Sequence, residues 1–264
     1  LGHIAPFAHR LGADLTRATQ PGQRLPLLLC LLLAGACAFG GRALLERLVL
    51  LPLVRRLPEG RLRRSALATA IALGTALVAG IAAELALIGL DWRGALGEES
   101  RALALALVGL ITFAAYVNGL GRALLSARRP SWRLSAIGEL TAARLRPFPP
   151  LLALAALLLG CAERLARSIG ASLAVSVTLR GAFALVISGL IGAALWRLHR
   201  TRLEAARLGI MLDAARPLWL AALLGAAAVG VVLSWLGVAA GYLAFAFFVA
   251  VQMLWTGVII ASAW

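Results

Sequence analysis

The residue types that most often carry catalysis or bind metals are few in this chain and stand far apart. The histidines are His3, His9 and His199, and all 26 basic residues are arginine. Without lysine, Walker-type phosphate loops and Schiff-base chemistry are excluded. The sequence also contains no HExxH or GxSxG motif and no grouping of His, Cys and carboxylates typical of a metal site. We therefore expect a protein that is not an enzyme, with no catalytic residues, no metal and no cofactor.

Two ionisable residues fall inside apolar runs that are long enough to cross a membrane. Glu84 lies in the run 66–90 and Arg180 in the run 173–196, both toward the same side of the predicted membrane. Charges in such runs are costly and mark a functional or paired group. Three roles stay open: snorkelling to the interface, a mutual ion pair, or a proton or substrate pathway. We favour a structural role, because transporters usually place several polar groups in one bundle.

Arginine is concentrated in loops between the apolar runs. Eight arginines are candidates for contact with anionic lipid headgroups or for setting topology: Arg55, Arg56, Arg61, Arg63, Arg64, Arg128, Arg129 and Arg133. Basic groups at a membrane surface gain about 1 kcal/mol each from anionic lipid. Trp132, next to Arg133, suits an interfacial anchor. Both interpretations, topology alone and lipid contact that positions a moving element, stay open; nucleic acid is not an expected partner, because the arginines flank apolar runs.

The elements that carry these residues are apolar runs. Hydrophobic residues make up 62% of the 264 residues, and the mean hydropathy is +0.92; soluble domains are about half apolar. About 20 apolar residues cross the hydrocarbon of a bilayer. Seven candidate spans occupy residues 25–39, 66–90, 102–120, 149–159, 173–196, 217–236 and 241–264. The fourth is short unless 161–169 continues it, and an extension of the first as an interfacial helix through Leu51 stays open.

Fold class and topology follow from the pattern of runs and loops. We predict an all-α polytopic membrane protein with about seven transmembrane helices arranged as hairpins, preceded by an interfacial or periplasmic segment, 1–24. Arginine-rich loops at 42–64, 122–146 and 197–216 alternate with nearly neutral loops. Because cytoplasmic loops carry the excess of arginine, the N-terminus is expected in the periplasm and the C-terminus in the cytoplasm.

Glycine is frequent inside the predicted spans. Small residues allow transmembrane helices to approach closely, and they also make helices easier to bend. We favour close packing as the role of these glycines: Gly74, Gly80, Gly89, Gly189, Gly192, Gly225 and Gly230.

Two segments resemble a known family. The run 121–146, which begins Gly-Arg-Ala-Leu-Leu-Ser-Ala-Arg-Arg-Pro-Ser-Trp-Arg-Leu, is similar to the transmembrane sensor region of bacterial MscS-like mechanosensitive channels. The large members with a DUF3772-type periplasmic domain are the most similar. The segments 241–244 (Gly-Tyr-Leu-Ala) and 252–257 (Gln-Met-Leu-Trp-Thr-Gly) also look like that family. The resemblance covers about residues 25–264.

The resemblance implies a location, a partner and a function. It implies a multi-pass protein of the bacterial inner membrane that contacts lipid and forms a homo-oligomer, a heptamer in that family. Residues 25–216 would form sensor-paddle hairpins, and residues 217–264 an inner transmembrane hairpin that ends before any pore helix. Its expected function is to sense membrane tension for a channel that releases ions and small solutes under hypo-osmotic stress.

The sequence departs from the family in one respect. A pore helix and the β-rich cytoplasmic vestibule of these channels have no counterpart in it, so the resemblance extends to the sensor region alone. Two other functions therefore stay open: a secondary transporter or permease, and a non-conducting membrane scaffold subunit.

Overall fold

The computed structural model describes residues 4–52, 61–125, 139–207 and 218–263, and within these ranges it contains helices and no strand. In chain order the elements are α1 (Ile4–Ala18), α2 (Arg24–Leu45), the π-helical turn η1 (Glu46–Leu50), α4 (Arg61–Leu90), α5 (Glu98–Leu124), α6 (Glu139–Leu145), α7 (Phe148–Ser168), α8 (Leu173–Arg207), α9 (Leu218–Ala239) and α10 (Leu243–Ala263).

Seven of the described helices are long and apolar enough to cross a membrane: α2, α4, α5, α7, α8, α9 and α10. The prediction of an all-α polytopic fold with seven spans is therefore confirmed. The fourth span is one continuous helix, Phe148–Ser168, because the chain stays helical through Glu163 and Arg167. Similarly, α8 continues from the expected end at residue 196 to Arg207. Long arginine side chains permit such extensions, since their charged ends reach water while their stems stay on the helix.

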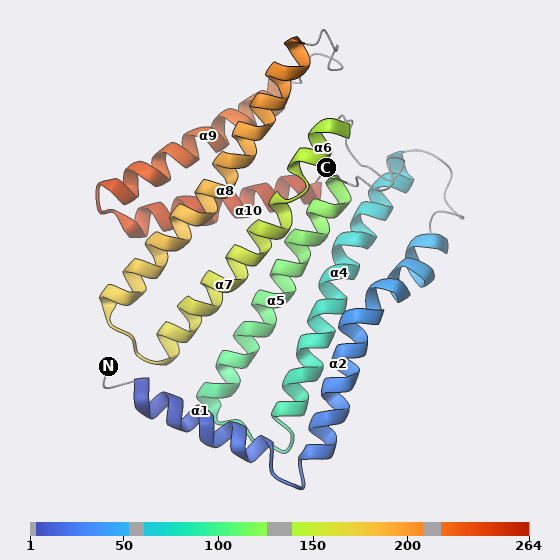
Figure 1. Ribbon diagram of the computed structural model, residues 1–264, viewed down its shortest axis with the longest axis vertical. Helices are drawn as coiled ribbons and strands as arrows, with labels where there is room; N and C mark the ends of the chain where they lie inside the picture. Colours follow the sequence, from blue (N-terminus) through green and yellow to red (C-terminus); the bar gives the residue numbers. More distant parts are fainter. Residues whose placement is uncertain (1–3, 53–60, 126–138, 208–217, 264) are drawn as a thin grey trace.

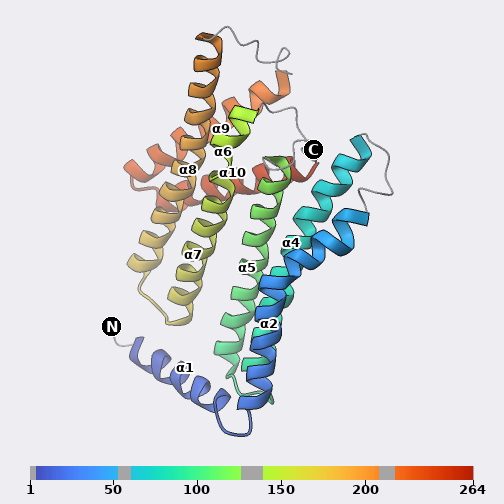
Figure 2. The same ribbon diagram turned by 45° about the vertical axis from the view of Figure 1, so that its right-hand side comes forward.

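The helices α2, α4, α5, α7 and α8 lie side by side in chain order, each packed on the next (Figure 1). Consecutive members are antiparallel, so the row is a series of hairpins. We call the end of the row near α1 and the loop 91–97 the α1 end, and the opposite end, where the arginine-rich loops begin, the arginine-rich end. At the α1 end, helix α1 lies across the row (Figures 1 and 2).

Glycines with positive φ close two of the hairpins. Gly170 (φ 61°) follows α7, and Gly241 (φ 82°) follows α9. After α7, the Ala171 amide donates to the carbonyl of Ala166 at 2.9 Å, and after α9 the Tyr242 amide donates to the carbonyl of Gly237 at 2.7 Å. This pattern satisfies the last helical carbonyls with a left-handed glycine. The chain can therefore reverse within a few residues.

Helix α10 runs across the row instead of along it. In both ribbon views it passes α8 and α7 and ends beside α5 (Figures 1 and 2). Ala250 and Leu254 belong to a buried cluster with residues of α7 and α8, and Val258 belongs to a second cluster with residues of α4, α5 and α7. Near its end, the Ser262 and Tyr116 hydroxyl oxygens are 2.9 Å apart. Helix α10 therefore packs across the middle of the row and connects α5, α7 and α8.

Close helix packing explains five of the seven glycines named above. A Cβ would contact a side chain of a neighbouring element at Gly74, Gly80, Gly89, Gly192 and Gly230. Close packing does not account for Gly189 and Gly225, where a Cβ would meet nothing within 4 Å. A tighter approach than any of these occurs at Gly119, where a Cβ would lie 3.0 Å from the Cα of Ala72 and overlap the Thr75 hydroxyl.

Replacing Gly119 with leucine should destabilise the α4–α5 contact. The added side chain meets backbone, which cannot rotate away, and overpacking of this kind costs about 1–3 kcal/mol of unfolding free energy. Gly109→Leu on the same helix is the matched control, because a Cβ there has open space. Thermal unfolding of both variants in detergent measures the difference. Equal unfolding temperatures would contradict the described α4–α5 packing.

Candidate functional site

Most of the arginines singled out from the sequence lie outside the described part of the molecule. This holds for Arg55, Arg56, Arg128, Arg129 and Arg133, and for Trp132. Arg61, Arg63 and Arg64 form the first turn of α4, but the positions of their side chains are not described. The interpretation of these residues as lipid contacts or topology signals therefore stays a prediction.

The two intramembrane charges do not pair with each other. Arg180 on α8 pairs with Glu163 on α7, with 3.5 Å between Arg180 Nε and Glu163 Oε1. Glu84 is exposed on α4 and has no ion-pair partner among the described residues. The reason is the order of the row, in which α5 and α7 lie between α4 and α8 (Figure 1). The mutual pair considered from the sequence is thus corrected to Arg180–Glu163.

The Arg180–Glu163 pair joins three helices near the α1 end. The guanidinium carbon of Arg180 lies 5.9 Å from the ring centroid of Phe247 on α10, which packs edge-on against Phe183. Arg167 Nη2 is 3.8 Å from the same Glu163 oxygen. The side chains of Arg180 and Glu163 are 41% and 18% exposed. The cluster therefore connects α7, α8 and α10 at the edge of the row. One signal for this pair was present in the sequence. Glu163 and Arg180 lie on either side of the hairpin turn at Gly170, at similar distances along the sequence, so an antiparallel hairpin brings them near each other.

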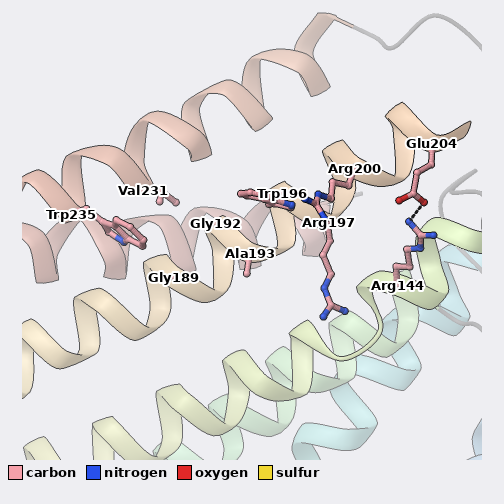
Figure 3. A pocket seen from close by; sticks show the side chains of 10 residues that line it. All are labelled: Arg144, Gly189, Gly192, Ala193, Trp196, Arg197, Arg200, Glu204, Val231 and Trp235. Atoms are coloured by element: carbon pink, nitrogen blue, oxygen red, sulfur yellow. Dashed lines mark ion pairs between the residues drawn. The ribbon is translucent and has the colours of Figure 1, made fainter. Parts of the chain in front are cut away.

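A groove of about 850 Å³ lies at the arginine-rich end, between α8 and α9, with Arg144 of α6 at its mouth (Figure 3). Its apolar wall is made of small and aromatic side chains: Gly189, Gly192, Ala193, Trp196, Val231 and Trp235. The Trp235 indole donates to the Ser188 hydroxyl at 3.0 Å, and Ser188 in turn donates to the carbonyl of Ala184 at 2.5 Å. This chain of hydrogen bonds fixes the ring of Trp235 against the groove.

Charged residues define the other end of the groove. Arg144 Nη1 lies 2.6 Å from Glu204 Oε2 and donates to the Thr201 hydroxyl at 3.3 Å. Two further arginines are held by aromatic rings: Arg197 lies 5.5 Å from the centroid of Phe148, and Arg200 lies 5.0 Å from that of Trp196.

Neither Arg197 nor Arg200 has a carboxylate partner in the part of the chain that the structure describes. Among the described residues, the groove therefore combines an apolar wall with Arg200 beside Trp196, whereas Arg197 is directed toward Phe148 on α7 (Figure 3). Sequence reasoning missed this groove. The spacing of Arg197 and Arg200 beside Trp196 on one helix was the available signal, but the opposite wall comes from α9.

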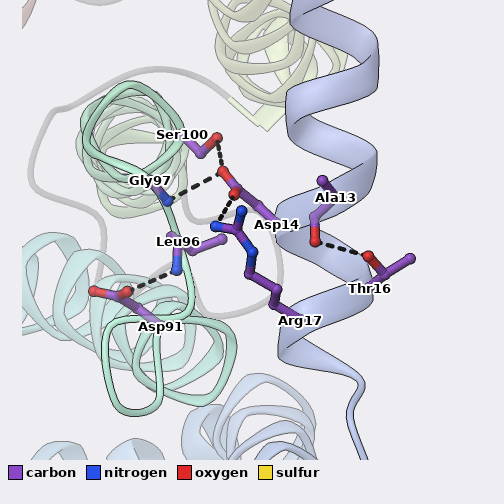
Figure 4. Close-up of polar contacts among 8 residues, drawn as sticks. All are labelled: Ala13, Asp14, Thr16, Arg17, Asp91, Leu96, Gly97 and Ser100. Atoms are coloured by element: carbon purple, nitrogen blue, oxygen red, sulfur yellow. Dashed lines mark hydrogen bonds and ion pairs between the residues drawn. The ribbon is translucent and has the colours of Figure 1, made fainter.

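A third polar cluster docks α1 at the α1 end (Figure 4). The Asp14 carboxylate is buried and accepts hydrogen bonds from the Ser100 hydroxyl (2.6 Å) and the Gly97 amide (3.1 Å), at the first turn of α5. Arg17 Nη1 lies 3.2 Å from the other carboxylate oxygen. A carboxylate at a helix N-terminus accepts hydrogen bonds from amides that have no partner within the helix, and its negative charge interacts favourably with the helix dipole. Asp14 therefore caps α5 from a separate helix, which sequence reasoning missed because the partner lies far along the chain.

These contacts shift the acidity of Asp14. The Ser100 hydroxyl, the Gly97 amide and the Arg17 guanidinium together hold the pKa of the Asp14 carboxyl below its ordinary value, against the opposing effect of burial. Each of these contacts favours the ionised form.

Comparison with protein-family models, with curated proteins and with solved structures finds no match to this chain. Within the described ranges, no group of three or more His, Cys, Asp or Glu side chains is placed to hold a metal ion.

Acidification should release α1 from the row. Because the folded-state pKa of Asp14 is lowered, its stabilising contribution is complete above the unfolded value, about 4, and is lost as the pH falls through the folded value. Distances between spin labels at Gly12 and Gly109, in a background without the native cysteines, should broaden below pH 4. Asp14→Asn should give broad distances already at pH 7, whereas Glu98→Gln, a nearby exposed control, should not.

The Arg180 pairing can be measured by a double-mutant cycle. We expect a coupling of about 0.5–1 kcal/mol between Glu163→Gln and Arg180→Gln in unfolding free energy, since the pair is in contact but partly exposed. The cycle of Glu84→Gln with Arg180→Gln should show additivity, because these residues lie on separated helices. Coupling in the second cycle but not in the first would contradict the described order of helices.

Proposed function

We propose that this chain is the tension-sensing membrane region of an MscS-like mechanosensitive channel that releases ions and small solutes under hypo-osmotic stress. The carrying observation is the row of hairpins, whose edge, α2 and α4, is one helix thick (Figures 1 and 2). Large apolar side chains are exposed on it, including Leu32 (69%), Phe39 (90%) and Leu77 (63%). Such a layer offers lipid a large contact area for its mass. The resemblance of residues 121–146 and 241–257 to that family is the second support.

The energetics favour a sensor made of many helices. When tension thins the bilayer, each helix gains or loses only fractions of a kcal/mol per Å of hydrophobic mismatch. A gate needs several kcal/mol of bias to open cleanly. Seven spans in each subunit, repeated around a homo-oligomer, which is heptameric in the family it resembles, would supply that sum. A single helix would not.

Helix α10 offers a route from the row to whatever gate it serves. Its residues Ala250, Leu254 and Val258 are buried against α5, α7 and α8. A change in tilt of these helices therefore has to move α10 or break those contacts, because packed interfaces have few alternative arrangements. The described contacts favour α10 over α2 as the output element, since α2 lies at the far edge.

In this proposal the protein has a defined orientation in the membrane and no catalytic role. The arginine-rich end faces the cytoplasm of a bacterium, in the inner membrane, and the N-terminus faces the periplasm, because arginine-rich loops are retained inside. The loop arginines contact anionic lipid headgroups there. The protein is not an enzyme in this proposal, and nucleic acid is not a partner.

The alternative of a secondary transporter draws less support. Transporters place polar groups and broken helices near the membrane midplane. The Arg180–Glu163 pair instead lies close to the α7–α8 turn, at one end of both spans. Solute uptake into proteoliposomes separates the two functions, and a scaffold subunit predicts neither uptake nor tension dependence.

Patch-clamp recording of the full-length protein tests the proposal. Deleting residues 25–216 should raise the tension needed to open the channel, because less membrane-coupled area then changes on opening. Gly119→Leu, which disturbs the α4–α5 contact, should shift the threshold as well, whereas Gly109→Leu should leave it unchanged. Identical thresholds for the deletion and the unaltered protein, at equal expression, would remove the sensor role.

A further inference from the structure

Helix α1 follows on to α2 through a short turn and is held on α5 by side chains, so it connects two helices that are separated by α4 in the row (Figures 1 and 2). We propose that α1 is a brace, which fixes the tilt of the α2–α4 edge relative to α5 until the contact of Asp14 breaks. The brace itself does not depend on what the protein senses. Its role in setting the opening tension rests on the tension-sensing proposal.

The turn between α1 and α2 is closed by hydrogen bonds. Arg24, at the start of α2, donates from Nε to the carbonyl of Thr19 at 2.9 Å and from its amide to the carbonyl of Gln20 at 3.1 Å. The Thr19 hydroxyl donates in turn to the carbonyl of Leu15 at 3.0 Å, within the last turn of α1. Ala18, the last residue of α1, is fully buried. These contacts fix the angle between α1 and α2, so a tilt of α2 has to move α1 as well.

The other attachment of α1 depends mainly on one carboxylate. Asp14 accepts hydrogen bonds from the Ser100 hydroxyl and the Gly97 amide, at 2.6 and 3.1 Å (Figure 4). Its side chain is only 8% exposed, so these bonds are shielded from water, and losing one leaves a buried polar group without its partner. The neighbouring pair of Arg10 and Glu99 is exposed, and exposed pairs contribute little.

The segment that receives Asp14 is itself held in place. The Asp91 carboxylate accepts a hydrogen bond from the Leu96 amide at 3.2 Å (Figure 4), and its other oxygen lies 3.2 Å from Nε of Arg101. The backbone carbonyl of Asp91 also accepts a hydrogen bond from the amide of Gly94 at 2.9 Å. These contacts fix the loop between α4 and α5, so the Gly97 amide is positioned for Asp14 by the loop's own hydrogen bonds.

The brace closes a ring of elements at the edge of the row. Helix α2 packs on α4, and α4 packs on α5. Through α1, the α1 end of α2 has a second connection to α5 that does not pass through α4. With both connections in place, α2 and α4 cannot tilt away from α5 at this end unless Asp14 leaves its site. In the tension-sensing proposal the brace would therefore set the tension at which the α2–α4 edge moves.

Spin-label distances across the row test the brace. In the full-length protein without its native cysteines, labels at the exposed positions Leu32 on α2 and Leu105 on α5 report the separation of these helices. Asp14→Asn should broaden the distances upward and raise the released population about tenfold, since hydrogen bonds to a charged group are lost. Glu98→Gln, an exposed neighbour of the site, should leave them unchanged.

Two further measurements separate the brace from general loosening of the fold. Labels at Leu105 and at Leu158, an exposed position on α7, span helices outside the ring, and Asp14→Asn should not change their distance. Ser100→Ala removes one donor but keeps the Gly97 amide, so it should broaden the Leu32–Leu105 distances less than Asp14→Asn does. This milder variant also supplies the test where Asp14→Asn does not fold.

Patch-clamp recording tests the role of the brace in gating. Asp14→Asn should open at lower tension than the unaltered protein, because the edge is then free to tilt, and Glu98→Gln should open at unchanged tension. The double variant Asp14→Cys/Ser100→Cys, without the native cysteines, restores the connection by a disulfide. Its threshold should rise on oxidation and fall again on reduction.

Three results would overturn the proposal. The first is an unchanged Leu32–Leu105 distribution in Asp14→Asn while the Gly12–Gly109 distances broaden, because α1 then leaves without freeing the edge. The second is equal broadening for the α2–α5 and α5–α7 label pairs. The third is a freed edge with an unchanged threshold, in recordings where deletion of residues 25–216 does raise it. If that deletion has no effect either, the tension-sensing proposal fails and the spin-label distances alone decide the brace.

Discussion

Lipid removes the usual reason for apolar helices to pack together. Since acyl chains are as apolar as leucine, helices in a bilayer associate through close van der Waals contact and hydrogen bonds. This molecule meets that constraint with small residues: the buried clusters contain Ala72, Ala114, Ala153 and Ala184, and Gly119 lets α5 approach the backbone of α4. The row of helices depends on these contacts, because its large side chains are mostly directed outward to lipid.

Polar side chains connect neighbouring helices near the two ends of the row. Asp14 caps α5 and so docks α1 across the loops at one end. Glu163 and Arg180 connect α7 with α8, and the ring of Phe247 brings in α10. At the arginine-rich end, Arg144 and Glu204 connect α6 with α8. Each pair lies at or toward one end of the spans, where water screens the charges and desolvation costs less.

The thin edge of α2 and α4 exposes apolar side chains, and α10 crosses the thicker part of the row. In the tension-sensing proposal, changes in bilayer thickness would act on that edge and α10 would transmit the resulting movement. The groove between α8 and α9 is beside that crossing.

Sequence alone determined the all-α polytopic class, the seven spans and the alternation of the loops, because length and apolarity of a run decide whether it can lie in hydrocarbon. It also located Glu84 and Arg180 as intramembrane charges. Tertiary structure decided their partners: the row separates Glu84 from Arg180 and brings Glu163 to Arg180 instead. It likewise decided the cap of α5 by Asp14, the crossing of α10, and the groove whose walls come from separate helices. The physical reason is that a hydropathy pattern fixes whether each helix enters the membrane. Which helices touch, and at what angle, depends on where small side chains such as Gly119 allow two backbones to meet.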